Sequence, residues 1–148
     1  MSQPTLTITP LQEEYDALYS SLCGLGLNAR TDKIGRLNVD HFPALNMTLA
    51  RGGHGKTQFG IQTQHLLDHA AFERVICAGA AGALAPEVKV GDLIGVTWTI
   101  EHDYNLKFVK RPHPQFKGDA KSIEQIQRLN LSYADFSIHF GIVAGGDE

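Results

Sequence analysis

Two adjacent acids follow the first predicted strand, at a place where a general base could act. Thr5–Thr9 alternates apolar and short polar residues and stops at a proline, and the spacing of the leucines that follow predicts a helix over Leu11–Cys23. Glu13 and Glu14 occupy its first turn, where carboxylates complement the helix dipole. A helix that follows a strand begins at the carboxyl edge of the sheet, where α/β proteins bind ligands, so Glu14 is a candidate catalytic group.

A glycine-rich segment, ARGGHGKT over Ala50–Thr57, fits a permissive form of the phosphate-binding loop. In that interpretation backbone amides hold phosphates, Lys56 neutralises the terminal ones and Thr57 coordinates magnesium. Against it, the chain is short for such a nucleotidase, the loop follows an alternating strand rather than a buried parallel one, and no apolar strand ends in a single aspartate. The plainer alternative is a glycine-rich turn at the start of a helix, which needs no nucleotide.

The histidines do not have the spacing of a metal site. His65 and His69 are four residues apart on a predicted helix without a third ligand nearby, which is typical of surface residues. His102 and Asp103 come at the end of a predicted strand. Because neighbouring strand residues point to opposite faces of a sheet, we expect these two side chains not to share one site.

The remaining elements place these residues in an alternation of strands and helices, which predicts an α/β domain. The apolar run Arg74–Ala78 is followed by glycines and alanines and predicts a central, buried strand of a parallel sheet. Residues 105–118 contain basic side chains and two prolines and are predicted to form a long surface loop. The other predicted elements are the strands Arg36–Phe42, Ala44–Ala50, Leu93–Ile100 and Ser137–Ala144, a helix from Lys56, and a helix over Asp119–Leu129.

The composition is that of one soluble globular domain. The chain has 148 residues, 43% hydrophobic and 20% charged, so we expect a single domain over 1–148. A net charge of −3 argues against nucleic acid as a partner and favours a small molecule. Without an apolar span or a signal segment, we expect no membrane partner and a cytoplasmic location. Cys23 and Cys77 form no CxxC pair and are expected to be buried apolar residues, and we expect neither metal nor cofactor.

Four segments, in order along the chain, resemble one family. The longest is VICAGAAGALAPEVKVGDLIGVTWTIEHD, which begins at Val75, and the others are TPLQEE, ARGGHGK and IVAGGDE. They are similar to the nucleoside phosphorylase and nucleosidase superfamily, and most similar to its methylthioadenosine/S-adenosylhomocysteine nucleosidase branch. The resemblance implies a three-layer α/β fold with a mixed central sheet. It also implies that the chain lacks the family's C-terminal elements and is the N-terminal two-thirds of a longer one.

The resemblance implies a reaction and a set of site residues. The reaction is hydrolysis of the N-glycosidic bond of a purine nucleoside, with water activated by Glu14. Ala80 stands where the branch has a serine, and His54 stands where an apolar residue lines the pocket for the 5′ group. A histidine there indicates a polar or carboxylate-bearing 5′ substituent, as in futalosine-like nucleosides, or a degenerate site. The implied substrate-binding residues are Leu11, His54, Ala80, Ala81, Gly82 and Leu106.

The resemblance also bears on the nucleophile, the assembly and the activity. The positions that hold phosphate in the phosphorylases carry Cys77, Ala80 and Ala81 here, so hydrolysis is favoured over phosphorolysis. The loop after Asp103 is similar to a segment that completes a partner's pocket, which implies a homodimer. Family members continue through a purine-stacking residue, a ribose-binding glutamate and the aspartate that protonates the base, so we expect the 148-residue chain alone to be inactive. Two alternatives stay open: a phosphate-loop nucleotide-binding protein acting through Ala50–Thr57, and a non-catalytic module with the nucleosidase fold that serves binding or dimerisation.

Overall fold

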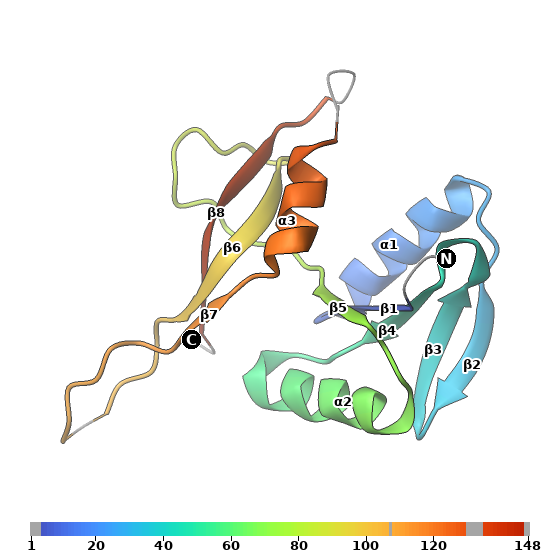
Figure 1. The fold of residues 1–148 in the computed structure, drawn as a ribbon, viewed down its shortest axis with the longest axis horizontal. Coiled ribbons are helices and arrows are strands. Elements are labelled where there is room, and N and C mark those ends of the chain that lie inside the picture. Colours follow the sequence, from blue (N-terminus) through green and yellow to red (C-terminus); the bar gives the residue numbers. More distant parts are fainter. Residues whose placement is uncertain (1–3, 107, 130–134, 147–148) are drawn as a thin grey trace. The chain divides into compact units, whose positions relative to one another are not determined.

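The computed structural model describes residues 4–106, 108–129 and 135–146. The chain divides into two compact units, Met1–Ala80 and Ala81–Glu148, and each is described by itself (Figure 1). Each unit combines a mixed β-sheet with helices. The expected α/β class with mixed strand directions is therefore confirmed, and the single domain over 1–148 stays a prediction.

The N-terminal unit is built on a five-stranded sheet with the order β2-β3-β4-β1-β5. The strand β1 pairs in parallel with β4 and with β5, whereas β3 is antiparallel to both β2 and β4. The helix α1 follows β1, and α2 connects β4 to β5. The bounds are β1 (Thr5–Thr9), α1 (Gln12–Gly24), β2 (Arg30–Ile34), β3 (Leu37–Phe42), a 3-10 turn (Pro43–Leu45), β4 (Met47–Arg51), α2 (Gly55–His69) and β5 (Arg74–Cys77).

Two helices cover opposite faces of this sheet and give the unit three layers. On one face, Leu6 and Ile8 of β1 lie in a buried apolar cluster with Leu66 of α2. On the other face, Tyr19 of α1 contacts the ring of Phe42 on β3 edge to face, with centroids 5.8 Å apart. Alternation along the strands sends successive side chains to the two faces, so one short sheet can carry both layers. The carboxyl ends of β1, β4 and β5 then meet at one edge of the sheet, because the three strands are parallel.

The C-terminal unit has a three-stranded sheet with the order β7-β6-β8. The strand β6 is parallel to β8 and antiparallel to β7. Asp119 caps the helix α3, since its Oδ1 accepts a 2.7 Å hydrogen bond from the backbone N–H of Ser122. The bounds are β6 (Leu93–Glu101), β7 (Gln115–Lys117), α3 (Ala120–Gln127) and β8 (Ile138–Gly145).

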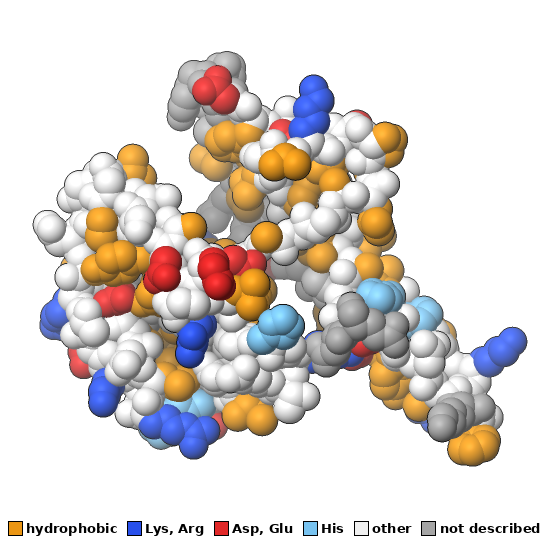
Figure 2. Space-filling view, turned by 180° about the vertical axis from the view of Figure 1, so that it is seen from behind, with side chains coloured by type: hydrophobic (Ala, Val, Ile, Leu, Met, Phe, Trp, Pro, Cys, Tyr) orange, Lys and Arg blue, Asp and Glu red, His pale blue; other side chains and the backbone are white. Residues whose placement is uncertain are grey.

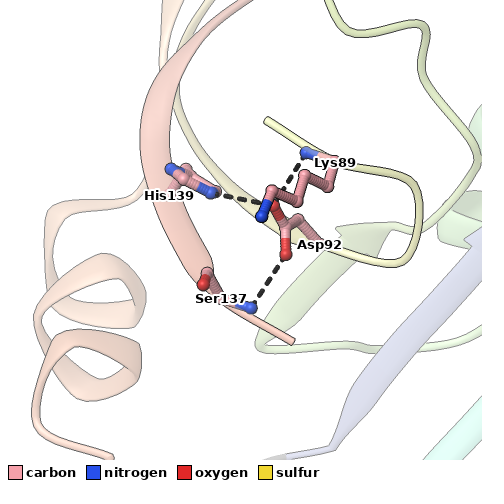
Figure 3. A network of polar contacts seen from close by, with 4 residues as sticks. All are labelled: Lys89, Asp92, Ser137 and His139. Atoms are coloured by element: carbon pink, nitrogen blue, oxygen red, sulfur yellow. Dashed lines mark hydrogen bonds and ion pairs between the residues drawn. The ribbon is translucent and has the colours of Figure 1, made fainter. Parts of the chain in front are cut away.

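A polar network around Asp92 joins the starts of β6 and β8 (Figure 3). Its carboxylate accepts hydrogen bonds of 2.9 Å from the backbone N–H of Lys89 and 2.9 Å from that of Ser137, and His139 Nε2 lies 3.1 Å from Asp92 Oδ2. The backbone hydrogen bonds from Lys89 and Ser137, together with His139, lower the pKa of Asp92 to about 2, against the opposing effect of desolvation. Asp92 therefore links the turn that precedes β6 to the start of β8.

Several predicted elements differ from the structure. The strand β2 was not predicted, because four of its five residues are exposed and its sequence RTDKI shows no apolar alternation. The short strand β7 lies within the segment predicted as loop. The strand β5, predicted to be central, is last in the order of its sheet, and Val75 and Ile76 expose 45% and 41% of their surface. An apolar run therefore identified the strand but not its place in the sheet.

One prediction about single residues was wrong, and the premise of another does not hold. Cys23 and Cys77 are exposed rather than buried, and both are free thiols. His102 and Asp103 follow the end of β6 in a turn, so the alternation of a strand does not separate them. A Cβ atom placed on Gly146 would lie 2.6 Å from His102 Nε2 and 3.2 Å from Asp103 Cγ, which puts both side chains against the same glycine.

The surface carries both charge signs and exposed apolar side chains. On the face seen in Figure 2, Lys and Arg side chains are dispersed among acids, and apolar side chains are exposed on both units. In the C-terminal unit, Leu84, Val90 and Phe108 expose more than nine-tenths of their surface. Within the described ranges, no helix is long and apolar enough to cross a bilayer.

Candidate active site at the start of the first helix

Glu14 lies in the first turn of α1, where the chain has just left the carboxyl end of β1. Leu11 precedes the helix with extended backbone angles, φ −106° and ψ 159°. Its backbone N–H donates a 2.9 Å hydrogen bond to Glu14 Oε2. The side chain of the third helical residue thus accepts from a backbone N–H before the helix that has no partner within the helix. Local sequence therefore fixes one oxygen of the carboxylate.

The other oxygen of Glu14 is held by a distant part of the chain. The backbone N–H of Ala80 donates a 2.7 Å hydrogen bond to Glu14 Oε1. This is possible because β5 runs parallel to β1, and Ala78 continues the pairing through a 3.0 Å bond to the carbonyl of Ile8. Gly79 lies so close that a Cβ atom there would be 3.1 Å from Glu14 Oε1. The glycine at this position therefore leaves the space that the carboxylate occupies.

The carboxylate can still act on a ligand. Each carboxylate oxygen has two lone pairs, so an oxygen that accepts one backbone hydrogen bond can accept another from water. The negative charge of Glu14 also affects Cys77, the last residue of β5. Although Cys77 is exposed, partial desolvation of its thiol raises the pKa of Cys77, and the negative charge of Glu14 raises it further. The thiol is therefore a weak nucleophile next to a carboxylate that can take a proton.

A hollow of about 280 Å³ opens beside Glu14. Glu14, Leu18 and Ser21 recur at helical spacing, so they share one face of α1 and form one wall of the hollow. The opposite wall comes from the ends of β1 and β5. The hollow is lined by Thr9, Glu14, Ala17, Leu18, Ser21, Ala78 and Gly79.

The segment Ala50–Thr57 joins β4 to α2 at the same edge of the sheet. The strand β4 is largely buried and parallel to β1. The prediction that this segment follows an alternating strand rather than a buried parallel one was therefore wrong. The turn itself is filled by Gln58, whose Oε1 accepts a 3.1 Å hydrogen bond from the backbone N–H of His54. Gly53, at φ +88°, has no room for a side chain beside Gln58. The His54 amide that a phosphate loop would direct at its ligand is therefore bonded within the protein.

The structure joins three of the expected site residues by hydrogen bonds. Leu11, Glu14 and Ala80 are joined by the two hydrogen bonds described above. His54 precedes α2 with an exposed side chain that does not cap the helix. Ala81, Gly82 and Leu106 belong to the C-terminal unit and are exposed there. The substrate-binding roles of all these residues stay predictions, as does the catalytic role of Glu14.

Sequence reasoning found Glu14 but missed the groups that hold it. The donor at Ala80 is a backbone N–H, which no side-chain pattern reveals. A second missed contact joins Arg51 Nη1 to Gln12 Oε1 at 2.9 Å, between the end of β4 and the start of α1. Among the described residues, no three His, Cys, Asp or Glu side chains gather where they could hold a metal ion.

The comparison that decides the family is with the model of the phosphorylase superfamily, which matches residues 7–148. The chain belongs to the phosphorylase superfamily. The match includes both Glu14 and Ala80, and also the glycine-rich turn before α2.

Several members of the phosphorylase superfamily are similar to the chain over about 110 residues. They are 5′-methylthioadenosine/S-adenosylhomocysteine nucleosidases of Mycobacterium bovis, 28% identical over 73% of this chain and 43% of the relative, and of Tolumonas auensis, 33% identical over 70% and 48%. An aminodeoxyfutalosine nucleosidase of Campylobacter jejuni is 26% identical over 69% and 47%. The chain thus spans about half the length of these curated relatives.

A solved structure shows the same fold. The D198N mutant of the Helicobacter pylori nucleosidase, with 5′-methylthioadenosine in its active site, matches all of this chain and 66% of that one, with a TM-score of 0.82. Sequence identity is 18%. The similarity confirms the predicted phosphorylase-like α/β fold.

Proposed function

We propose that this protein hydrolyses the N-glycosidic bond of a purine nucleoside, with water as the nucleophile and Glu14 as the general base. The observation that carries the proposal is the Glu14 carboxylate, held between the backbone N–H groups of Leu11 and Ala80 beside an open hollow. Membership of the phosphorylase superfamily supports the reaction class. The names of the nucleosidase relatives support a purine nucleoside as the substrate.

The reaction needs a base placed on one face of the ribose. The bond between C1′ and the purine nitrogen breaks through a state with positive charge on the sugar, and the water oxygen bonds to C1′. Glu14 takes a proton from that water, and its negative charge stabilises the positive charge that develops on the sugar. The electron pair of the broken bond leaves with the purine, which an acid must protonate. The proposal assigns no residue to that second role.

Water suits this site better than phosphate does. The first turn of α1 carries Glu13 beside Glu14, and two carboxylates repel a phosphate dianion. Cys77, Ala80 and Ala81 supply no charged donor that could offset this repulsion. We therefore expect that added phosphate does not accelerate cleavage.

The side chain of His54 bears on the 5′ substituent of the substrate. An exposed imidazole before α2 can donate to a carboxylate or a hydroxyl, whereas a methylthio group offers it little. We propose a nucleoside with a polar 5′ group, with methylthioadenosine or S-adenosylhomocysteine as the alternative. Relatives of both kinds occur among the nucleosidases similar to this chain. Leu11, Ala80, Ala81, Gly82 and Leu106 are the remaining proposed substrate contacts.

We propose a homodimer, a single nucleosidase-like domain over 1–148 and a cytoplasmic location, with no membrane and no nucleic acid as partners. Sedimentation of the purified protein tests the dimer. A mass equal to one chain at micromolar concentration would exclude it.

The function is tested by release of free purine from methylthioadenosine and from a 5′-carboxylate adenosine, with and without phosphate. We expect hydrolysis by the protein in its full natural length, at a rate independent of phosphate. Phosphate-dependent cleavage would make it a phosphorylase. Magnesium-dependent ATP binding without purine release would favour the phosphate-loop alternative, and nucleoside binding without release would favour the non-catalytic module.

A further inference from the structure

A buried carboxylate on β3 lies beneath the first turn of α1. Asp40 exposes 9% of its surface, on the face of the sheet that α1 covers. Its Oδ1 accepts a 2.6 Å hydrogen bond from Thr31 Oγ1, its cross-strand neighbour on β2. Its Oδ2 accepts a hydrogen bond from the hydroxyl of Tyr15 on α1. Both oxygens of a buried charge are therefore satisfied, one of them by the helix.

Tyr15 is the residue next to Glu14, so its bond to Asp40 constrains the same helical turn. Burial raises the pKa of Tyr15 above its usual value, and the hydrogen bond and charge of Asp40 raise it further. The phenol therefore stays protonated, and remains a donor to Asp40, throughout the physiological pH range. Because residues 14 and 15 differ by about 100° around the helix, Tyr15 can reach the sheet while Glu14 faces Ala80.

The apolar contacts of α1 with the sheet are made by partly buried side chains. No residue of the helix, all of which is described, is buried. Tyr15 stacks on Tyr19 with ring centroids 6.4 Å apart and planes inclined by 10°, and Tyr19 meets Phe42 edge to face. The contact from Gln12 to Arg51 is exposed, whereas the hydrogen bond from Tyr15 joins the first turn to a buried carboxylate of the sheet and so constrains the turn's position.

We propose that Tyr15 and Asp40 are positioning residues for Glu14: their hydrogen bond holds the first turn of α1 so that the Glu14 carboxylate meets the Ala80 N–H. The proposal rests on the proposed function for its catalytic consequence. A displacement of about 1 Å in a catalytic group costs about a hundredfold in rate, so a loosened turn lowers kcat. The side chain of Tyr15 does not line the hollow, so KM changes less than kcat.

The test compares Tyr15→Phe and Asp40→Asn with Tyr19→Phe, which removes a hydroxyl one turn further along the same helix. In the protein of full natural length, we expect Tyr15→Phe and Asp40→Asn to lower kcat for purine release at least about tenfold, with KM changed less than about threefold. Tyr19→Phe keeps the wild-type kcat. In a Glu14→Gln background, Tyr15→Phe produces no further loss, because the group it positions has been disabled.

A second measurement reads the geometry without activity. Exchange of the Ala80 amide proton with solvent reports its hydrogen bond to Glu14. We expect exchange at least about tenfold faster in Tyr15→Phe and in Asp40→Asn, and unchanged in Tyr19→Phe. Circular dichroism shows whether each variant is folded. If Tyr15→Phe does not fold, the comparison is made with Asp40→Asn alone.

The outcomes separate the two proposals. If the wild type releases purine and Tyr15→Phe and Asp40→Asn keep its kcat and its Ala80 exchange rate, the positioning role is wrong. An equal fall in kcat for Tyr19→Phe would also overturn it, because the effect would then be general loosening of α1. If the wild type releases no purine, the proposed function fails, and the Ala80 exchange rate alone decides whether Tyr15 and Asp40 position Glu14.

Discussion

Glu14 Oε1 and the backbone N–H of Ala80 are joined by a 2.7 Å hydrogen bond between groups 66 residues apart in the chain. The bond links the first turn of α1 to the segment that follows β5, and it exists because β1 and β5 are parallel neighbours. The position of the Glu14 carboxylate therefore depends on α1, on the pairing of β1 with β5 and on the segment that follows β5.

Gly79→Ala tests the space around the carboxylate. The added Cβ would lie 3.1 Å from Glu14 Oε1 and 3.2 Å from Pro10 Cδ, closer than side chains usually pack, so it presses on the carboxylate and on the proline ring. We expect purine release to fall at least about tenfold while the protein stays folded. Gly60→Ala, where a Cβ would meet nothing within 4 Å, is the matched control and keeps the wild-type rate. Wild-type activity in Gly79→Ala would show that the carboxylate position does not matter.

His54→Ile tests the proposed preference for a polar 5′ group. An apolar side chain before α2 removes the donor and favours a thioether, so affinity for methylthioadenosine rises relative to that for a 5′-carboxylate nucleoside. One pocket contact contributes about 1 to 3 kcal/mol to such a preference. Calorimetric titration of both ligands into wild type and variant gives the ratio. Identical ratios would mean that His54 does not line the substrate pocket.

Asp92→Asn tests the network at the start of β6 and β8. The pKa of Asp92 is lowered to about 2 in the fold by its hydrogen bonds from Lys89 and Ser137. A carboxylate with a lowered native pKa stabilises the fold above its unfolded pKa of about 3.9, and this contribution is lost as pH falls toward 2. We expect the variant to melt at a lower temperature at pH 7 and to lose less stability between pH 4 and pH 2.

The control for Asp92 is Asp32→Asn, which removes an exposed carboxylate 3.5 Å from Arg30. Exposed ion pairs contribute little, so this variant keeps the wild-type melting temperature and acid dependence. Equal acid dependence in wild type and Asp92→Asn would contradict the role of the network.

His65 gives the N-terminal unit a pH dependence of its own. Its Nε2 accepts a 3.1 Å hydrogen bond from the backbone N–H of Arg36, which ties the turn between β2 and β3 to α2. Desolvation lowers the pKa of His65, the charges of His69 and Arg36 lower it further, and Asp68 opposes them. Because the native state binds this proton less readily than the unfolded chain, stability is full above about pH 6.5 and falls as pH drops below it.

Urea unfolding between pH 5 and pH 7.5 measures this effect. We expect a shallower loss of stability toward pH 5 in His65→Gln than in the wild type, because glutamine can accept the Arg36 N–H without binding a proton. His113→Gln, which removes a histidine of the C-terminal unit, keeps the wild-type slope. The same slope in all three proteins would refute the assignment.

Local patterns predicted most of the fold, and they failed where burial or chain pairing decided the outcome. Thr5–Thr9 was predicted with its observed bounds because a proline ends an alternating strand. The strand Arg30–Ile34 was missed because it is mostly exposed, and Arg74–Cys77 was misplaced because an apolar run does not show which strands pair with it. In the site, Glu14 could be found from its residue type and position. Its partners could not, because the Ala80 contact is a backbone donor and Asp40 meets Tyr15 only through tertiary structure.

The most direct test of the account measures binding and hydrolysis together in Glu14→Gln, in the protein of full natural length. Glutamine keeps the shape of glutamate but cannot take a proton from water, so we expect purine release to fall by about 10² to 10⁴. Calorimetry should give a nucleoside affinity within about threefold of wild type, because the base acts only in the reaction. Unchanged purine release by Glu14→Gln would contradict the account and place the base on another residue.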